Sequence, residues 1–274
     1  MAIITLTSDI GQQDYLVGAI KGQLLSQNSG FNIVDITHYM SQTNYPQAAY
    51  ICSNAFKYYP PLTFHIVILN FFDTTVNHLL IARHKGQYII CPDNGILTMI
   101  TGEKPNEIAR LPLHGQHTLL ARTYIIAKAI EEIVQNASFA VDTETSIDIL
   151  EKYPLKATIG PDWMEGQILF IDNFENVVIN ITKEEFEEQC NGRAFSILFT
   201  RDEQITAISN DYAAIQEGEK LAWFNSAGYL EIAINKGNIA GLFGLQRYNE
   251  KMNKVGMASQ NKWFYQTVKI FFQG

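Results

Sequence analysis

Two aspartates follow the first β-branched run of the chain. The run at 3–7 leads into Asp9, and Asp14 comes five residues later. An Asp at the carboxyl end of the first strand of an α/β sheet lies where ligands bind in such folds. Its carboxylate can accept hydrogen bonds from both hydroxyls of a ribose. Taken alone, the segment is better explained by aspartates that cap the following helix.

Two later segments combine polar turns with ring or amide groups. Segment 91–95 (C-P-D-N-G) has turn chemistry, because Asn and Gly readily adopt left-handed conformations, and by itself it predicts only a turn. Segment 171–181 (I-D-N-F-E-N-V-V-I-N-I) brings Asp172, Phe174 and Asn176 together between two predicted strands. An aromatic face beside an amide suits a purine, which needs stacking and edge hydrogen bonds. Turns rich in Asp and Asn are equally common without a ligand.

A fourth segment, 223–233 (W-F-N-S-A-G-Y-L-E-I-A), predicts a hairpin with Glu231 on its second strand. Taken alone, it is a hairpin with an ordinary surface Glu. Together the four segments are far more specific, because several motifs in register do not arise by chance as readily as one short motif.

The sequence resembles the S-adenosyl-L-methionine (SAM) hydroxide adenosyltransferases, a family related to the fluorinase and chlorinase enzymes. The resemblance extends to about Leu245 and rests on T-S-D-I-G-Q-Q-D-Y-L-V-G-A-I-K-G, P-D-N-G-I-L, I-D-N-F-E-N-V-V-I-N-I, and Y-A-A-I-Q-E-G-E followed by N-S-A-G-Y-L-E-I-A. It implies an N-terminal α/β domain, a C-terminal β-barrel domain and a homotrimer. The nucleoside would lie between the N-terminal domain of one subunit and the C-terminal domain of the next.

The resemblance also implies roles for individual residues. Asp9 matches the family Asp that holds the ribose hydroxyls, and Asp14 matches one near the methionine end. Asp172, Phe174 and Asn176 match the adenine and methionine-amine pocket of the C-terminal domain. Tyr212 matches an aromatic that stacks on adenine. Ser226 and Glu231 match the hairpin that lines the same pocket. The strand beyond, near Ile234, would offer backbone groups to the adenine edge.

Such a site performs a substitution at the ribose C5′. Methionine leaves as a neutral thioether, so no acid is needed for its departure. The protein must align a nucleophile behind C5′ and remove its water. When the nucleophile is water, it must also lose a proton, for which a base is useful.

This chain departs from the hydrolase pattern at the positions that activate water. Family hydrolases carry V-D-P-G-V-G-T followed by Arg, and later F-H-G-R-D, which supply an Asp, an Arg and a His. Here 69–78 reads L-N-F-F-D-T-T-V-N-H and 118–123 reads T-L-L-A-R-T. The Asp becomes Asn70, the Arg has no counterpart near Asn77, and the His becomes Leu120. An amide cannot act as a base, and Leu can neither bind nor carry a proton.

Three replacements are open. Asp73 or His78 could bring a carboxylate or an imidazole into the gap, and His114 or His117 could replace the missing His. Alternatively the nucleophile is a halide, which needs no deprotonation. The simpler interpretation makes the six histidines mostly surface or loop residues and Asp73 a solvated loop residue.

The sequence therefore predicts an adenosyltransferase that hydrolyses SAM to adenosine and methionine, with Asn70 near C5′ as a hydrogen-bonding group. The alternatives are a non-catalytic protein that binds adenosine or SAM, and a halogenase-like enzyme. A purely structural oligomer is disfavoured by the intact ligand motifs. SAM is substrate or ligand, and neither a further cofactor nor a metal site is predicted.

Alternating strand and helix signals in the first half predict an α/β domain with a largely parallel sheet. The predicted strands are 3–7, 31–36, 64–69, 79–82 and 88–91. Three helices are predicted: one that starts at Asp14, one at 46–59 and one at 118–134. The strand at 64–69 is apolar on both faces, as a central parallel strand should be. The pair 79–82 and 88–91 predicts a hairpin.

The second half predicts a small all-β barrel. Its predicted strands are 167–171, 177–181, 194–199, 205–209, 221–224 and 229–234, with one short helix at 183–190. The resulting boundaries are 1–152 for the α/β domain, 163–248 for the barrel and 249–274 for an aromatic extension that packs as an extra element. A linker is expected between about 151 and 164, where Pro and Gly interrupt the pattern.

Composition excludes several classes of protein. Of 274 residues, 47% are hydrophobic and 28 acids outnumber 20 bases, giving a net charge of −8 at pH 7. Such a chain is too hydrophobic for disorder and too acidic for nucleic acid or an anionic membrane as primary partner. The three cysteines are far apart, and no signal peptide or membrane-length apolar stretch is present, which predicts a soluble cytoplasmic protein.

Overall fold

The computed structural model describes residues 2–72, 77–136, 147–200, 203–242, 244–245 and 267–273. The chain divides into two compact units, Met1–Pro154 and Leu155–Gly274. Asp73 lies outside the described residues, as does most of the predicted aromatic extension. Among the described helices, none combines the length and the apolar character needed to cross a membrane.

The first unit contains a six-stranded sheet in the order β2-β1-β3-β5-β4-β6. Its strands are β1 (Ile3–Ser8), β2 (Asn32–Thr37), β3 (Phe64–Ile68), β4 (His78–His84), β5 (Gln87–Pro92) and β6 (Glu107–Pro112). Strands β2, β1, β3 and β5 are parallel, and β4 pairs antiparallel with β5 and β6. The prediction of a mostly parallel α/β sheet is confirmed.

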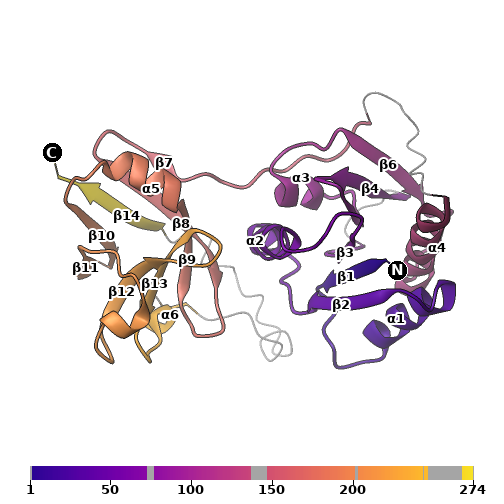
Figure 1. Ribbon diagram of the computed structural model, residues 1–274, viewed down its shortest axis with the longest axis horizontal. Helices are drawn as coiled ribbons and strands as arrows, with labels where there is room; N and C mark the ends of the chain where they lie inside the picture. Colours follow the sequence, from indigo (N-terminus) through magenta and orange to yellow (C-terminus); the bar gives the residue numbers. More distant parts are fainter. Residues whose placement is uncertain are drawn as a thin grey trace. The chain divides into compact units, whose positions relative to one another are not determined.

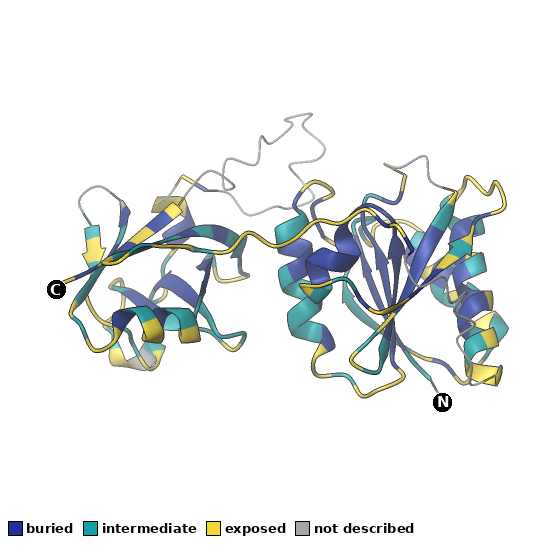
Figure 2. Cartoon of the chain, turned by 90° about the horizontal axis from the view of Figure 1, so that it is seen from above, coloured by how far each residue is buried: buried dark blue, intermediate teal, exposed yellow. Residues whose placement is uncertain are grey.

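Helices cover both faces of this sheet (Figure 1). Helices α1 (Leu16–Gln27) and α4 (Leu119–Asn136) pack on one face, and α2 (Tyr45–Phe56) and α3 (Ile96–Thr101) pack on the other. Each face has its own apolar core, and the inner strands β1, β3, β5 and β4 between them are mostly buried (Figure 2). The unit is therefore a three-layer α/β/α domain, in which β3 is buried along its whole length.

Two helix starts show how local sequence fixes these elements. Asn44 caps α2 by accepting the backbone N–H of Gln47 at 2.9 Å, with Pro46 in the first turn. Asp14 was predicted to cap α1, but the cap position falls on Tyr15. The Asp14 carboxylate still accepts the N–H of Leu16 at 2.9 Å, because an Asp one residue earlier can reach the same end of the helix.

The second unit contains an eight-stranded sheet in the order β11-β10-β14-β8-β9-β13-β12, with β7 paired to β8. Its strands are β7 (Thr158–Ile159), β8 (Trp163–Ile171), β9 (Val177–Thr182), β10 (Phe195–Thr200), β11 (Glu203–Ile205), β12 (Lys220–Phe224), β13 (Tyr229–Ile234) and β14 (Thr267–Phe272). All named pairs are antiparallel. An isolated bridge between Ile208 and Ala222 brings the segment after β11 to β12 and nearly closes a barrel. This confirms the predicted all-β barrel.

Short helices complete the second unit. They are α5 (Lys183–Cys190), η1 (Tyr212–Ala214) and α6 (Ile239–Leu242). A capping box starts α5, because the Thr182 hydroxyl accepts the N–H of Glu185 while the Glu185 carboxylate accepts the N–H of Thr182. Strand β14 lies between β10 and β8, and its alternating side chains place Val268, Ile270 and Phe272 in the core.

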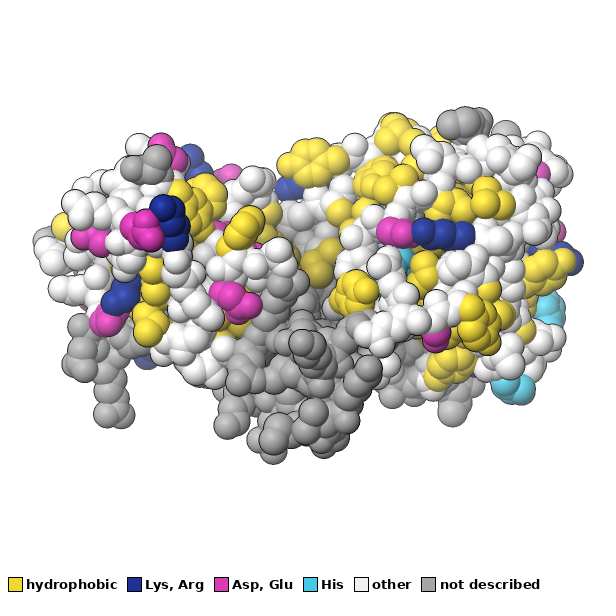
Figure 3. All heavy atoms as spheres, turned by 90° about the horizontal axis from the view of Figure 1, so that it is seen from below, with side chains coloured by type: hydrophobic (Ala, Val, Ile, Leu, Met, Phe, Trp, Pro, Cys, Tyr) yellow, Lys and Arg dark blue, Asp and Glu magenta, His cyan; other side chains and the backbone are white. Residues whose placement is uncertain are grey.

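The molecular surface mixes charge signs on the face drawn in Figure 3, where Lys and Arg side chains often adjoin Asp or Glu. Among the described residues, ion pairs such as Lys236–Glu217 and Lys220–Glu203 join side chains of opposite charge. The visible basic groups on that face are scattered and form no continuous basic track, which a nucleic-acid backbone requires.

Candidate functional site

Polar residues of the first unit gather at one edge of its sheet. The parallel strands β1, β3 and β5 end there, at Ser8, Ile68 and Pro92, and the antiparallel β4 begins there at His78. In open α/β sheets, the carboxyl ends of parallel strands are where ligands bind. Below, this edge is called the carboxyl edge.

Asp9 and Asn70 are joined at the carboxyl edge. The backbone N–H of Asn70 donates to Oδ2 of Asp9 at 2.7 Å, and the N–H of Asp9 donates to the carbonyl of Ile68 at 3.1 Å. Asn70 has φ of 49°, a left-handed conformation that Asn tolerates better than most residues. Burial raises the pKa of Asp9, and the N–H groups that it accepts partly offset this rise. The carboxylate is thus fixed in direction and retains capacity for further donors.

A buried histidine supports the loop that carries Asp9. His38 is 2% exposed, its Nδ1 lies 2.7 Å from the Ser8 hydroxyl, and its carbonyl accepts the N–H of Gly11 at 2.8 Å. On its other side lies Asp35, which also binds Lys21 at 2.6 Å. Burial raises the pKa of Asp35, but hydrogen bonds and charges from Lys21 and His38 outweigh it, so the net shift is downward.

Two of the six histidines are buried, one in the bend after β2 and one within β3. His38 is bound beneath the Asp9 loop, and His65 is fully buried, with Nδ1 2.7 Å from the Thr5 hydroxyl. Burial lowers the pKa of His65 to about 4, so this imidazole stays neutral near pH 7. The hydroxyls of the neighbouring strand β1 make these buried rings possible, and that pairing across strands is not visible in the local sequence.

The P-D-N-G segment is more than a surface turn. Asp93 and Asn94 are 6% and 1% exposed. The Asn94 amide donates to the carbonyl of Leu69 at 3.0 Å, which ties this turn to the residue before Asn70. Asp93 accepts the backbone N–H of Leu150 through Oδ1 at 2.8 Å, and its Oδ2 lies 3.0 Å from Nε2 of His78.

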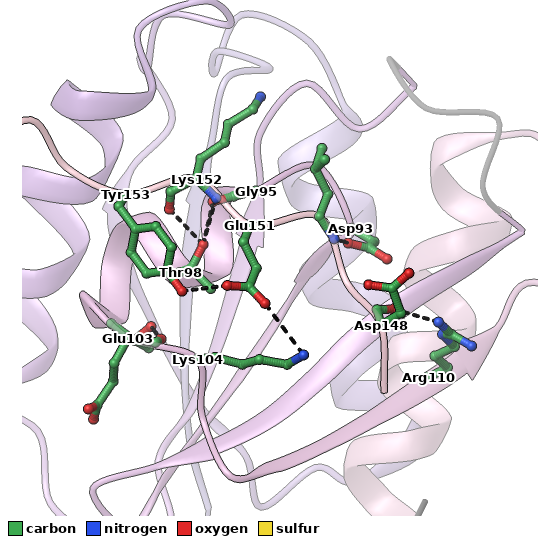
Figure 4. Close-up of polar contacts among 12 residues, drawn as sticks. Asp93, Gly95, Thr98, Glu103, Lys104, Arg110, Asp148, Glu151, Lys152 and Tyr153 are labelled. Carbon is green, nitrogen blue, oxygen red and sulfur yellow. Dashed lines mark hydrogen bonds and ion pairs between the residues drawn. The ribbon is translucent and has the colours of Figure 1, made fainter. Parts of the chain in front are cut away.

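The segment 147–153, here called the strap, crosses next to this turn (Figure 4). Thr98 of α3 makes two bonds with Lys152, one to its carbonyl at 2.6 Å and one from its N–H at 2.9 Å. Glu151 pairs with Lys104 at 3.4 Å. Tyr153 also donates to Glu151, and Arg110 donates to the carbonyl of Asp148. The strap therefore belongs to the first unit and holds Asp93 from one side.

Leu120 and Arg122, the positions expected to match a family His and Arg, both have structural contacts. Leu120 is half-buried and packs against the core beneath α1 and α4. Arg122 donates to the carbonyl of Phe71 at 2.8 Å and to that of Gln116 at 3.1 Å, and its guanidinium lies 4.7 Å from the centre of the Phe72 ring. Arg122 thus anchors the loop that follows Asn70. His114 and His117 are exposed.

The second unit has its own polar cluster, formed by Asp172 and Asn176 at the turn between β8 and β9. Oδ1 of Asp172 accepts the N–H groups of Phe174 and Asn176 at 2.8 Å each, and Oδ2 lies 3.1 Å from the Asn176 amide. The turn leaves the Phe174 ring 75% exposed, whereas Asn176 is 3% exposed. A large exposed aromatic beside a fixed amide leaves a ring face open for stacking.

Glu231 lies at the centre of this cluster and is 4% exposed. Oε1 accepts Trp223 Nε1 at 2.9 Å, Asn176 Nδ2 at 3.1 Å and the Tyr212 hydroxyl at 3.4 Å, while Oε2 accepts Asn225 Nδ2 at 3.1 Å. Burial raises the pKa of Glu231, with a further rise from the charge of Asp172 and opposing effects of its donors. Burial, followed by the charge of Glu231, also raises the pKa of Tyr212 far above its usual range.

The remaining predicted positions of the second unit are less engaged. Ser226 is exposed at the hairpin turn, and Ile234 packs partly buried against the barrel core. Trp223 and Asn225 were missed by the sequence reasoning. A signal existed for Trp223, because it lies directly opposite Glu231 in the hairpin predicted at 223–233, and its indole N–H is a natural partner for a buried acid.

Within the described part of the chain, no group of three or more His, Cys, Asp or Glu side chains is arranged to hold a metal ion. What the described residues offer is hydrogen bonding and aromatic surface: one oriented carboxylate at Asp9, and an amide, a ring and a phenol around Asn176. These groups suit a hydroxyl-bearing heterocyclic ligand.

Fold and site together define a two-domain α/β plus β-barrel protein with polar clusters suited to a nucleoside. A family model for the SAM hydroxide adenosyltransferase N-terminal domain matches residues 4–141, and one for the C-terminal domain matches residues 166–251. The chain belongs to the SAM hydroxide adenosyltransferase family.

Individual relatives are distant. The chain is 24% identical over 262 residues to (R)-S-adenosyl-L-methionine hydrolase of Thermus thermophilus, covering 90% of this chain and 97% of the relative. It is 23% identical over 284 residues to a fluorinase of Actinopolyspora mzabensis, covering 89% and 94%. A crystal structure of an uncharacterized conserved protein from Thermotoga maritima has a TM-score of 0.77 at 20% identity, covering 99% of this chain and 100% of that one, and shows the same fold.

Proposed function

We propose that the protein binds SAM and transfers its adenosyl group to water, releasing adenosine and methionine. The observation that carries this proposal is the Asp9 carboxylate, held at the carboxyl edge by the Asn70 N–H within a segment that matches the family. Membership of a family that contains SAM hydrolases supports the same reaction.

The proposed binding roles follow from the two clusters. Asp9 accepts the ribose hydroxyls, and Asp14 lies toward the methionine end. Phe174 and Tyr212 offer aromatic surface to adenine, and the Asn176 amide bonds to its edge or to the methionine amine. The other members of the predicted pocket are Asp172, Ser226, Glu231 and Ile234.

Within that pocket Glu231 acts through other residues. Both of its oxygens are already occupied by donors from its own chain, so it has little capacity left for a ligand. Its role is to hold Asn176 and Tyr212 in fixed orientations, which lowers the entropy cost of ligand binding.

The reaction needs no general acid, because methionine leaves as a neutral thioether. Water attacks C5′ from the side opposite sulfur, the C5′–S bond breaks, and its electron pair stays on the neutral thioether of methionine. The protein supplies alignment and a site with little water. Asn70 hydrogen bonds near C5′ without taking a proton, because an amide cannot act as a base.

We also propose a homotrimer in which each site takes its ribose-binding face from one subunit and its adenine-binding face from the next. Complementation tests this arrangement. Asp9→Ala and Phe174→Ala variants should each be weak, but trimers assembled from a mixture should regain activity at about a quarter of their sites, where both intact faces meet. Light scattering must give three subunits, and unrestored activity in mixed trimers would contradict shared sites.

A second candidate is a binding protein without catalysis. It is favoured by Asn70 in place of an acid and by Leu120, whose side chain packs against an apolar core where relatives have His. A halogenase-like activity remains the third candidate, because a halide needs no base and a fluorinase is among the relatives.

One experiment separates the three. The protein is incubated with SAM, with and without fluoride or chloride, and the products are resolved by chromatography while calorimetry measures binding. Adenosine supports hydrolysis, a 5′-halogenated nucleoside supports halogenation, and binding without turnover supports the second candidate. Neither binding nor turnover would contradict all three.

A further inference from the structure

His78 and Asp93 form a carboxylate–imidazole pair at the carboxyl edge. Nε2 of His78 lies 3.0 Å from Oδ2 of Asp93, and their side chains are 18% and 7% exposed. The other carboxylate oxygen, Oδ1, accepts the backbone N–H of Leu150 from the strap, so Asp93 is fixed from both sides (Figure 4 shows the Asp93 side). The acid is buried and oriented, while the imidazole retains access to solvent.

This pair is linked to Asp9 through a short series of contacts. Asp93 is followed by Asn94, whose amide binds the carbonyl of Leu69 at 3.0 Å. Leu69 is followed by Asn70, whose N–H binds Asp9 at 2.7 Å. Each step is one hydrogen bond or one peptide unit, and all of it lies within the first unit. The imidazole therefore belongs to the same edge as the proposed ribose-binding carboxylate.

The state of the imidazole follows from its partner. When the Asp93 carboxylate accepts from Nε2, Nδ1 is the ring nitrogen left to take a proton. None of the described residues makes a hydrogen bond to Nδ1. A carboxylate that fixes the ring and stabilises the imidazolium is the arrangement that lets histidine take a proton from a nucleophile.

We propose that His78 is the general base of this protein and that Asp93 positions it, in place of the family residues replaced by Asn70 and Leu120. This inference rests on the proposed hydrolysis of SAM. The oxygen of water forms a bond to C5′, the C5′–S pair leaves with methionine, and the water proton moves to Nδ1 of His78. The imidazolium, paired with Asp93, later releases that proton to solvent.

Several other charged or titratable groups face this region. On the β6 side, the register partner of His78 is Pro112, and the loop beyond it carries the exposed His114 and His117. The strap contributes Asp148 and Glu151, which bind Arg110 through a carbonyl and Lys104 through an ion pair. Of these groups, only His114 and His117 could replace His78 as a base near neutral pH.

The test compares three variants by turnover, SAM affinity and pH profile. His78→Gln should lose about 10²- to 10⁴-fold in kcat, the usual contribution of general base catalysis, while calorimetry finds SAM binding unchanged. Asp93→Asn should lose less kcat and keep a shifted pH profile. His84→Gln, at the other end of the same strand, is the matched control and should match the unmodified protein.

A chemical rescue separates catalysis from folding. His78→Ala should regain part of its turnover when imidazole is added, and the rate should rise with the unprotonated fraction of imidazole, which a purely structural role would not produce. A fall in kcat on the acid side of the pH profile should be present in the unmodified protein and absent from His78→Gln, because only an unprotonated imidazole can take a proton.

Two outcomes would overturn the inference while leaving the function intact. One is a His78→Gln variant that keeps both kcat and the acid-side fall. The other is loss of turnover in His114→Gln or His117→Gln instead. If the unmodified protein itself never releases adenosine from SAM, the proposed function fails and the base is overturned with it.

Discussion

Asn70 donates its backbone N–H to the Asp9 carboxylate at 2.7 Å, so position 70 contacts this carboxylate through its main chain. The bond joins the ends of β1 and β3, and Asn70 makes it from a left-handed backbone conformation, which Asn tolerates better than most residues. Asp9 is therefore held by the main chain of the loop that follows β3.

The first prediction concerns Asp9. Asp9→Asn should weaken SAM binding by about 10- to 100-fold, the usual loss when a hydrogen-bonded charge is removed. Because burial raises the pKa of Asp9 above 3.8, its charged form costs stability at neutral pH, and Asp9→Asn should melt at a higher temperature than the unmodified protein.

Calorimetry and thermal melting at pH 7 check both halves of this prediction. Asp162→Asn, an exposed acid of the second unit, is the control and should change neither quantity. Unchanged affinity in Asp9→Asn would show that this carboxylate does not hold the ribose.

The second prediction concerns Glu231 and pH. Its folded-state pKa lies above the ordinary 4.5, so the folded protein binds the proton more tightly than the unfolded chain. The resulting stability is fully present below about pH 4 and is lost as pH rises through the folded-state pKa. The Gln in Glu231→Gln does not titrate. The free energy of unfolding of the unmodified protein, compared with that of Glu231→Gln, should therefore be highest at acid pH.

Urea unfolding of both proteins between about pH 3.5 and 7 measures this difference in free energy. The other acids titrate in both proteins, so their contributions cancel from the difference in free energy of unfolding. A difference that grows with rising pH would contradict the assigned direction.

The third prediction concerns Phe174, whose ring is 75% exposed. Phe174→Ala should leave the melting temperature unchanged and should weaken SAM binding by about 5- to 150-fold, the range for one aromatic that stacks on a base. Tyr58→Ala is a matched control, because Tyr58 is 74% exposed and follows α2 at the opposite edge of the first unit's sheet. Equal effects of the two substitutions would argue against a binding role for Phe174.

The fourth prediction concerns the two glycines that flank α3. Gly95 has φ of 92° and Gly102 has φ of 74°, so Ala at either position costs about 1–2 kcal/mol of left-handed strain. A Cβ at Gly95 would also lie 2.5 Å from Cγ of Lys152, whereas a Cβ at Gly102 meets nothing within 4 Å. Gly95→Ala should therefore be clearly the less stable variant in urea unfolding, and equal losses would mean that the strap moves aside at no cost.

The fifth prediction concerns β14. Ile270 is fully buried in the barrel core, so Ile270→Ala should cost about 2–5 kcal/mol of unfolding free energy. Lys269→Ala, on the outer side of the same strand, should change it by about 0.5 kcal/mol or less. If both variants unfold alike, β14 contributes little to the barrel.

Local sequence accounts for the elements whose signals lie within a few residues. The helix at 183–190 was predicted with its observed bounds, and in the structure a capping box of Thr182 and Glu185 starts it. The hairpin of β4 and β5 was likewise visible from its central turn. Strands β6 and β14 were missed because their pairing partners are distant: Thr267, for example, lies opposite Gln167.

The same limit applies to the site. The sequence predicted that Asp9 follows the first strand of an α/β sheet, at the end where ligands bind. The saturation of Glu231 and the burial of His38 depend on side chains from other strands, such as Trp223 and Ser8, that only the folded sheet brings close. Long-range hydrogen bonds of this kind have no signature in residue spacing.

The position of β14 between β8 and β10 also has a consequence for how the chain matures during synthesis. The first unit is complete once residue 154 has left the ribosome, but the barrel cannot close until residues 267–272 are made, about a hundred residues after their partner β8. Until then two strand edges stay unpaired, and such edges readily recruit other chains. Nascent or prematurely terminated copies should therefore depend on chaperones far more than the finished protein does.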